Sequence, residues 1–151
     1  MSSDVRRAGA ADGDEVTGVV ERAFAHYVPR IGGRPAPMDE DYDQLCARGE
    51  VYVSGDPIRG VLVLRDGGDH LFVDVVAVDP PAQGSGIGGE LMGFAELEAV
   101  RLGRPELRLL TNERMTENLA FYAHLCYEEY ERRTEHGYRR VYLRKAVPVT
   151  R

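Results

Sequence analysis

The sequence has 151 residues, of which 43% are hydrophobic and 29% are charged, and its formal net charge is −6. These values are typical of one globular domain, and we expect it to span residues 1–151. The acidic balance disfavours a general nucleic-acid binder, which would present a basic face. Because the sequence has no signal-like start and no run of 18 apolar residues, we expect no membrane association and predict a cytoplasmic protein.

The two cysteines, Cys46 and Cys126, form neither a CxxC pair nor part of a Cys/His cluster. Paired or clustered thiols are the usual signature of a disulfide framework or a metal site. We therefore predict no metal site, and we expect both residues to be buried, reduced thiols.

The N-terminal third of the chain predicts one short strand and two helices. Residues 5–8 can form the strand, and a stripe of apolar residues at helical spacing follows: Val16, Val20, Ala23 and Tyr27. Three prolines and two glycines within 29–37 indicate a loop. The second helix is predicted over 39–47, with Asp39 as its N-cap.

The remaining two thirds predict an antiparallel meander, then a crossover, then a hairpin. We expect strands at 51–54, 60–65, 71–78, 107–111, 127–134 and 138–145, and helices at 86–102 and 115–125. The order β-α-α-β-β-β-α-β-α-β-β predicts an α/β (α+β) domain. Its mixed, mostly antiparallel sheet would have six or seven strands, with helices on both faces.

A glycine-rich loop follows the apolar strand 71–78. The strand ends at Asp79, and residues 83–88 lead directly into a helix. This arrangement directs unpaired backbone N–H groups and the positive end of the helix dipole at one point, which favours a phosphate or pyrophosphate. Glycines also let the main chain approach an anion closely without a basic side chain.

Other glycine motifs fit this loop less well. Gly84, Gly86 and Gly89 satisfy the dinucleotide fingerprint GxGxxG. Residues 79–83, however, separate the first glycine from the strand, and an antiparallel hairpin takes the place of further βα units. The loop lacks the GK[ST] of a Walker A motif, and Ser85 lacks the flanking glycines of a hydrolase elbow. A loop that only permits close helix–strand packing is the structural alternative.

The segment Val78-x-Pro80-x-x-Gln83-Gly84-x-Gly86-Ile87-Gly88 resembles the acetyl-CoA pyrophosphate motif, Q/R-x-x-G-x-G/A, of the GNAT N-acetyltransferases. The order of elements along nearly the whole chain is similar to that family's order. The resemblance implies an acyl-CoA N-acyltransferase fold and acetyl-CoA as the acetyl donor. The acceptor would be a primary amine of a small molecule or a protein, which attacks the thioester directly. A non-catalytic acyl-CoA-binding module is the alternative.

The resemblance also implies which residues bind the cofactor. Loop amides would hold the pyrophosphate, and strand 71–78 would pair with pantetheine where it separates from 107–111. These main-chain positions are Val76, Ala77, Val78, Gln83, Gly84, Ser85, Gly86, Ile87 and Gly88.

The second cofactor segment of the family resembles Asn112–Tyr127. The family often has a pantetheine-contacting asparagine at the position of Met115. Asn112 or Asn118 would replace it here, and Asn118 is the better candidate, although such an asparagine can simply cap the helix. The family usually has glycine at the position of Cys126, and cysteine tolerates a positive φ poorly.

Tyr122 matches the family tyrosine that lies near the cofactor sulfur and protonates the leaving thiolate. A phenol with a pKa near 10 stays protonated at neutral pH and can donate to that thiolate. Helical packing against the sheet is the alternative. The carbonyl oxygen of the thioester could accept a hydrogen bond from the backbone N–H of Val76 or a neighbour.

Two carboxylates are candidates for the general base that deprotonates the amine, directly or through water. Asp74 lies in an otherwise apolar strand, on the face expected to carry Phe72, Val76 and Val78. A carboxylate there is costly without a partner, so it would be a base, a substrate anchor or half of a structural ion pair. Glu113, after the next strand, is the second candidate.

In the family, the loop between the first two helices and the late hairpin enclose the acceptor site. Here these segments are 27–38 and 134–139. Tyr27, Arg30 and Arg34 are the candidate acceptor-binding residues; the alternatives are a core position for the tyrosine and a solvated loop for the arginines. An exposed strand near the end of the chain would allow a homodimer.

Overall fold

The computed structural model describes residues 4–148, so the two ends of the predicted domain lie outside the described part. Seven strands form one sheet in the order β1-β2-β3-β4-β5-β7-β6. The strands are β1 (Val5–Arg7), β2 (Val51–Ser54), β3 (Gly60–Asp66), β4 (Leu71–Val78), β5 (Glu106–Asn112), β6 (Glu128–Glu135) and β7 (Tyr138–Ala146). Among the strands of the described residues, only the neighbours β4 and β5 are parallel. This confirms the predicted mixed, mostly antiparallel sheet.

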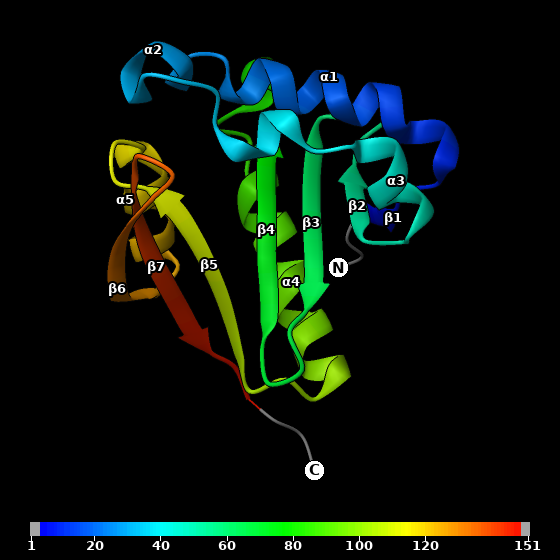
Figure 1. Ribbon diagram of the computed structural model, residues 1–151. Coiled ribbons are helices and arrows are strands. Elements are labelled where there is room, and N and C mark those ends of the chain that lie inside the picture. The colour runs from blue at the N-terminus through cyan, green and yellow to red at the C-terminus, as the bar shows by residue number, and fades with distance from the viewer. Residues whose placement is uncertain (1–3, 149–151) are drawn as a thin grey trace.

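Helices cover both faces of the sheet, as predicted (Figure 1). They are α1 (Gly13–Phe24), α2 (Tyr27–Ile31), α3 (Tyr42–Ala47), α4 (Ile87–Leu102) and α5 (Thr116–His124). One apolar core lies between α1, α3 and the sheet, and a second lies between the opposite face, α4 and α5. Among the described residues, no helix is both long and apolar enough to cross a bilayer.

The predicted loop 29–37 is wrong in its first part, because the short helix α2 occupies Tyr27–Ile31. Pro29 is the third residue of this helix, where an N–H would have no intrahelical acceptor, so the proline does not break it. Gly32 ends α2 in the left-handed conformation, with φ 79°, and its N–H donates to the Val28 carbonyl. Residues 4–148 therefore contain one helix more than the sequence predicted.

The second predicted helix begins later than expected. Asp41, and not Asp39, is the N-cap of α3, because its Oδ1 accepts a hydrogen bond of 3.1 Å from the Gln44 N–H. Asp39 ends a short 3-10 turn, Ala36–Asp39. Three candidate capping acids occupy positions 39, 41 and 43, and tertiary packing selects between them.

The expectation of two buried thiols is half correct. Both cysteines are free, but Cys46 is buried and Cys126 is exposed. Cys126 follows the last turn of α5 with φ 71°, the left-handed conformation that a glycine would normally adopt. This position after the helix turns its side chain to solvent.

The last strand of the chain, β7, lies inside the sheet, and β6 forms the edge. Most side chains of β6 are charged. A charged edge strand discourages pairing with another sheet. The homodimer stays a prediction.

A β-bulge in β4 determines the geometry of the sheet's centre. Val75 lies opposite Val63, but Val73 lies opposite Leu64, so Asp74 is an extra residue in β4. Side chains on either side of the bulge consequently change face: Val73 packs in the α4 core and Val75 in the α1 core. An insertion of one residue reverses the inward and outward alternation of a strand.

The predicted common face of Phe72, Asp74, Val76 and Val78 is therefore wrong. Val76 packs with the α4 core, on the face opposite the one expected from alternation. Phe72 is the register partner of Arg65, whose side chain pairs with the Asp74 carboxylate on the α3 side. Simple alternation along the sequence could not reveal the inserted residue.

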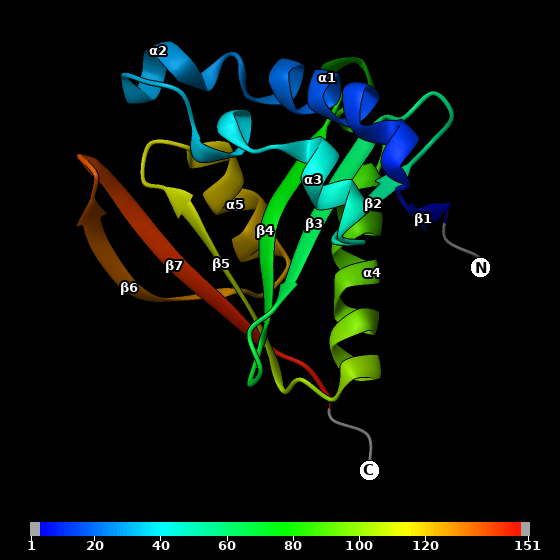
Figure 2. The same ribbon diagram turned by 45° about the vertical axis from the view of Figure 1, so that its right-hand side comes forward.

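The strands β4 and β5 separate along their length. Their parallel register includes only Leu71 with Leu107 and Phe72 with Arg108. Figures 1 and 2 show that the two strands lie together at the bottom of the molecule and diverge toward the top. The bulge bends β4 at this point. Within the described residues, 73–78 of β4 have no β5 partner, and this part of the main chain is available to a ligand.

Candidate active site

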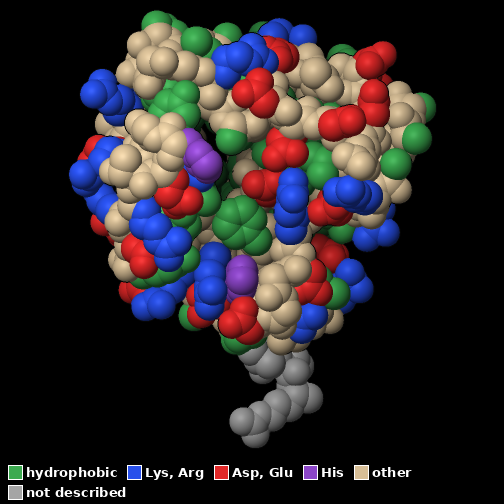
Figure 3. All heavy atoms as spheres, in the orientation of Figure 1, with side chains coloured by type: hydrophobic (Ala, Val, Ile, Leu, Met, Phe, Trp, Pro, Cys, Tyr) green, Lys and Arg blue, Asp and Glu red, His purple; other side chains and the backbone are tan. Residues whose placement is uncertain are grey.

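Two cavities meet where β4 and β5 separate. The first has a volume of about 450 Å³ and the second about 430 Å³. Four residues line both: Phe24, Val76, Asn118 and Tyr122. Figure 3 shows a hollow on this face of the molecule with acidic side chains beside it. A group placed at the shared residues would be reached from both cavities.

The glycine loop lines the second cavity. Gly84 and Gly86 have φ values of 84° and 92°, which a residue with a Cβ adopts only with strain. The first bond of α4 runs from the Glu90 N–H to the Gly86 carbonyl, 3.0 Å away. The N–H groups of residues 87–89 consequently have no acceptor within the helix, and the helix dipole adds positive potential there.

Side chains fix the ends of this loop. Arg22 of α1 makes two hydrogen bonds of 3.0 Å to the Asp79 carboxylate, at the end of β4. Gln83 Nε2 donates to the Val78 carbonyl at 3.2 Å, and the Ser85 hydroxyl donates to the Ala82 carbonyl. These hydrogen bonds hold the loop in one conformation without any ligand.

The second cavity contains most of the predicted cofactor residues. Those that line it are Val76, Ala77, Val78, Gln83, Gly84, Gly86, Ile87, Gly88, Asn118 and Tyr122. Ser85 and Asn112 are not among its lining residues. Ser85 braces the loop, and Asn112 lines the first cavity, where its Oδ1 accepts a hydrogen bond of 2.9 Å from the Arg114 N–H.

Of the two candidate asparagines, only Asn118 lies at the junction of the cavities. Its Nδ2 lies 3.6 Å from the sulfur of Met115, which also receives the Thr111 hydroxyl at 3.5 Å. Met115 precedes α5 and is 4% exposed. The buried methionine sulfur thus contacts the Asn118 amide one helical turn away and helps to orient it.

Tyr122 is 6% exposed and lines both cavities. Its ring centroid lies 5.3 Å from that of Phe121 and 5.7 Å from that of Tyr127. Burial raises the pKa of Tyr122 well above that of a free phenol. The hydroxyl is consequently protonated throughout the physiological pH range and can act as a hydrogen-bond donor at the junction.

The first cavity is lined by segments far apart in the sequence. They are 34–40 around the 3-10 turn, residues 72–76 of β4, the end of β5 and residues 136–140 of the hairpin. A Cβ on Gly33 would lie 2.3 Å from the Tyr138 hydroxyl, so the loop and the hairpin pack tightly together here. The structure thus brings parts of both predicted acceptor-site segments, 27–38 and 134–139, into one wall.

Asp74 also lines this cavity. Its Oδ2 lies 2.9 Å from Arg65 Nη2, an ion-pair distance without hydrogen-bond geometry. Glu40 lies 3.5 Å from the same Nη2. Burial and then the Asp74 carboxylate raise the pKa of Glu40. Glu40 was missed by the sequence analysis, because it stands in an irregular acidic segment and approaches Asp74 only through the fold.

The predicted acceptor residues are divided between different places. Arg34 lines the first cavity, with Asp39 at 2.9 Å and Glu21 at 2.8 Å. Tyr27 is buried and lines the second cavity instead. Arg30 lines neither cavity.

Two carboxylates near these segments make ion pairs. Arg30 Nη1 lies 2.6 Å from Glu117 Oε1. Burial and the nearby Glu117 carboxylate raise the pKa of Tyr27 to about 12. Glu113 lines neither cavity and pairs with Arg132, 2.7 Å away on β6. The structure therefore brings Asp74, and not Glu113, to the cavities.

Solved structures share this architecture over nearly the whole chain. The PaiA N-acetyltransferase of Thermoplasma acidophilum, in complex with coenzyme A, has a TM-score of 0.80 and 16% identity over 97% of this chain and 99% of that chain. YncA of Salmonella typhimurium, with acetyl-CoA, has a TM-score of 0.74 and 17% identity, covering 100% and 97%. The ribosomal-protein-S18-alanine N-acetyltransferase of Escherichia coli has a TM-score of 0.77 and 14% identity, covering 99% and 96%. The likeness establishes the acyl-CoA N-acyltransferase fold.

A sequence model of one family, described as "Acetyltransferase (GNAT) domain", matches residues 46–129, which is more than half of the chain. The chain therefore belongs to the GNAT family of acetyltransferases. No curated protein matches the sequence at a significant level. The matched region contains the bulge, the glycine loop, Asn118 and Tyr122.

Proposed function

We propose that this protein is an N-acetyltransferase that moves the acetyl group of acetyl-CoA to a primary amine of a small molecule or a protein. The observation that carries the proposal is the junction of the two cavities at Val76, Asn118 and Tyr122. A donor in one cavity and an acceptor in the other would meet there. A non-catalytic module would not need a second cavity or a buried phenol at the junction.

The second cavity fits coenzyme A. The pyrophosphate is a double anion, and the amides of residues 87–89 lack acceptors within their helix. The space above the loop is open, since a Cβ built at Gly84 or Gly86 would meet no atom within 4 Å. Both glycines have a positive φ. The unpaired edge of β4 offers main-chain hydrogen bonds to the amides of pantetheine.

In the proposed reaction, the lone pair of the neutral amine forms the new C–N bond at the thioester carbonyl, and the C–S bond breaks. Backbone N–H groups near Val76 donate to the carbonyl oxygen as it gains charge. Tyr122 donates its hydroxyl hydrogen to the departing sulfur. The proton of the phenol passes to the sulfur and gives the free thiol of coenzyme A, and the proton that the new amide nitrogen loses passes to the phenolate and restores the phenol.

An ammonium must lose a proton before it attacks, because its lone pair is otherwise occupied. Asp74 is the candidate base in the first cavity, directly or through one water. Glu113 does not fit this role, because it lines neither cavity and makes an ion pair with Arg132.

The test measures acetyl-CoA binding by calorimetry and then release of free thiol with a panel of amines, with the acetylated product identified by mass spectrometry. We expect acetyl-CoA to bind and at least one amine to gain an acetyl group. Binding of acetyl-CoA without transfer to any small amine or peptide amine would support the module instead. Failure to bind acetyl-CoA would contradict both functions.

A further inference from the structure

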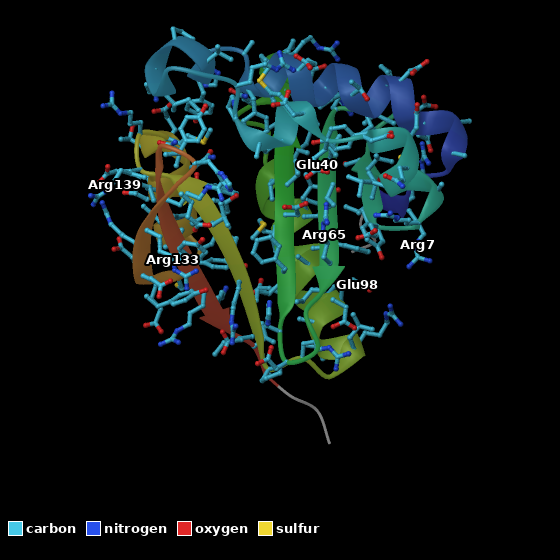
Figure 4. All side chains as sticks on the ribbon, in the orientation of Figure 1. Arg7, Glu40, Arg65, Glu98, Arg133 and Arg139 are labelled. Atoms are coloured by element: carbon cyan, nitrogen blue, oxygen red, sulfur yellow. The ribbon has the colours of Figure 1, made fainter. Side chains whose placement is uncertain are left out.

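A group of charges beside the first cavity contains more carboxylates than cations. Arg65 of β3 has three acidic neighbours: Asp74 at 2.9 Å, Glu40 at 3.5 Å and Glu50 at 3.9 Å. Figure 4 shows Glu40 and Arg65 on the same face, where Glu40 comes from the segment before α3 and Arg65 from the sheet. Glu50 also lies 4.0 Å from Arg48 Nη1, so two guanidiniums face three carboxylates and the group retains a net negative charge.

The other charged residues of this cavity are neutralised elsewhere. Arg34 contacts the carboxylates of Asp39 and Glu21. Arg140 lies 3.6 Å from Glu135, on the neighbouring strand β6. The excess negative charge of the cavity is consequently located at Glu40 and Asp74, and of the three partners of Arg65 only Glu50 is not a lining residue.

The excess negative charge lies within the length of a short alkyl chain from the junction of the two cavities. Asp74 and Val76 are two residues apart on β4, so their Cα atoms are separated by at most about 7 Å. Apolar side chains line the same cavity, among them Phe24, Ile31 and Phe72. A short alkyl chain could lie against them, with the reacting amine at the junction beside Asp74 and the other end of the chain at Glu40.

We propose that Glu40 determines acceptor specificity by binding a second cationic group of the acceptor, a short alkyl chain away from the amine that is acetylated. Glu40 is a specificity residue in this account, because it touches the distal cation and not the reacting atoms. The inference rests on the proposed function and narrows its substrate class to short diamines and similar dications. An acceptor that is held only by its reacting ammonium near Asp74 would not need a second cationic group.

The experiment compares 1,4-diaminobutane with pentylamine, which has the same number of heavy atoms but a methyl group in place of the distal ammonium. With saturating acetyl-CoA, kcat/KM for the diamine should exceed that for pentylamine by about tenfold or more, as one charge-assisted hydrogen bond would provide. The Glu40→Gln variant should lose most of this preference through a higher KM for the diamine. Glu50→Gln is the matched control: it removes a carboxylate from the same arginine outside the cavity, and it should retain the preference.

Calorimetry of acetyl-CoA binding by each variant separates this inference from the proposed function. Equal kcat/KM values for the two amines, or equal loss of preference in the Glu40 and Glu50 variants, would overturn the specificity role while leaving acetyl transfer intact. Transfer to no amine, whether or not acetyl-CoA binds, would overturn the inference together with the enzymatic proposal.

Discussion

The two cavities that meet at Tyr122 are built in different ways. The second is formed largely by main chain, from the unpaired edge of β4 and the glycine loop before α4. The first is formed by side chains of segments far apart in the sequence, with an excess of carboxylates at Glu40 and Asp74. A main-chain site suits a feature common to many reactions, which in the proposed function is a pyrophosphate, whereas a side-chain site can change its ligand with a few substitutions.

Tyr122 belongs to both cavities, and its substitution tests whether they cooperate in one reaction. Tyr122→Phe removes the donor at the junction, and we expect kcat to fall on the order of 100-fold or more, as for loss of a general acid. The affinity for acetyl-CoA, measured by calorimetry, should stay close to that of the wild type, because the ring remains.

Tyr127→Phe is the control for this substitution. Tyr127 contacts the Tyr122 ring but lines neither cavity, and its buried hydroxyl has no hydrogen-bond partner among the described residues. We expect no loss of kcat and no loss of stability in this variant. Similar turnover in both variants would remove Tyr122 from the chemistry.

A side chain added to the glycine loop should disturb the second cavity, which that loop lines, and leave the first cavity unchanged. Gly86→Ala places a side chain at φ 92°, which costs about 1–2 kcal/mol of strain or shifts the loop amides. Loss of one hydrogen bond to a charged group would weaken acetyl-CoA binding about 10–100-fold.

Gly93→Ala, in the middle of α4, serves as the control, because a Cβ there would meet no atom within 4 Å. This change should stabilise the helix by up to about 1 kcal/mol and leave the Kd for acetyl-CoA unchanged. Equal effects of the two substitutions on Kd would show that the loop conformation is not required.

Substitution of Cys126 tests whether the left-handed backbone after α5 lowers the stability of the protein. Cys126→Gly should relieve the left-handed strain at φ 71° and raise the free energy of unfolding by about 1 kcal/mol. Cys126→Ala retains the strain and should be nearly neutral, because the cysteine is exposed. Urea unfolding of the three proteins measures the difference; a stabilised alanine variant would contradict the role of φ.

The smallest expected effect is that of the Glu40 charge, in the first cavity, on the stability of the protein. The pKa of Glu40 is raised in the folded protein, so the folded state disfavours its ionised form. The free energy of unfolding therefore falls as the pH rises from the ordinary glutamate pKa through the higher pKa of the folded state. Glu40→Gln should therefore unfold at slightly higher urea concentration than the wild type at pH 7. The difference should shrink below the ordinary glutamate pKa, and a variant less stable at pH 7 would contradict this sign.

The elements that form the second cavity could be predicted from the sequence because their determinants are contiguous. Strand 71–78, the loop and the following helix were all located correctly, and the glycines define the loop whatever surrounds them. The first cavity depends on contacts between segments far apart in the sequence, which no local sequence pattern indicates. Glu40 reaches Arg65 across the fold, and the bulge at Asp74 reverses the alternation on which the predicted face of β4 depended.

The most direct test of the account is a ¹H–¹⁵N NMR titration of the protein with desulfo-CoA, in which the amides of the loop are followed individually. If main-chain N–H groups bind the pyrophosphate, the largest shifts should occur at residues 84–89, with smaller shifts along 76–78. Saturable binding that leaves the loop amides unmoved, with the shifts located elsewhere, would contradict the central claim.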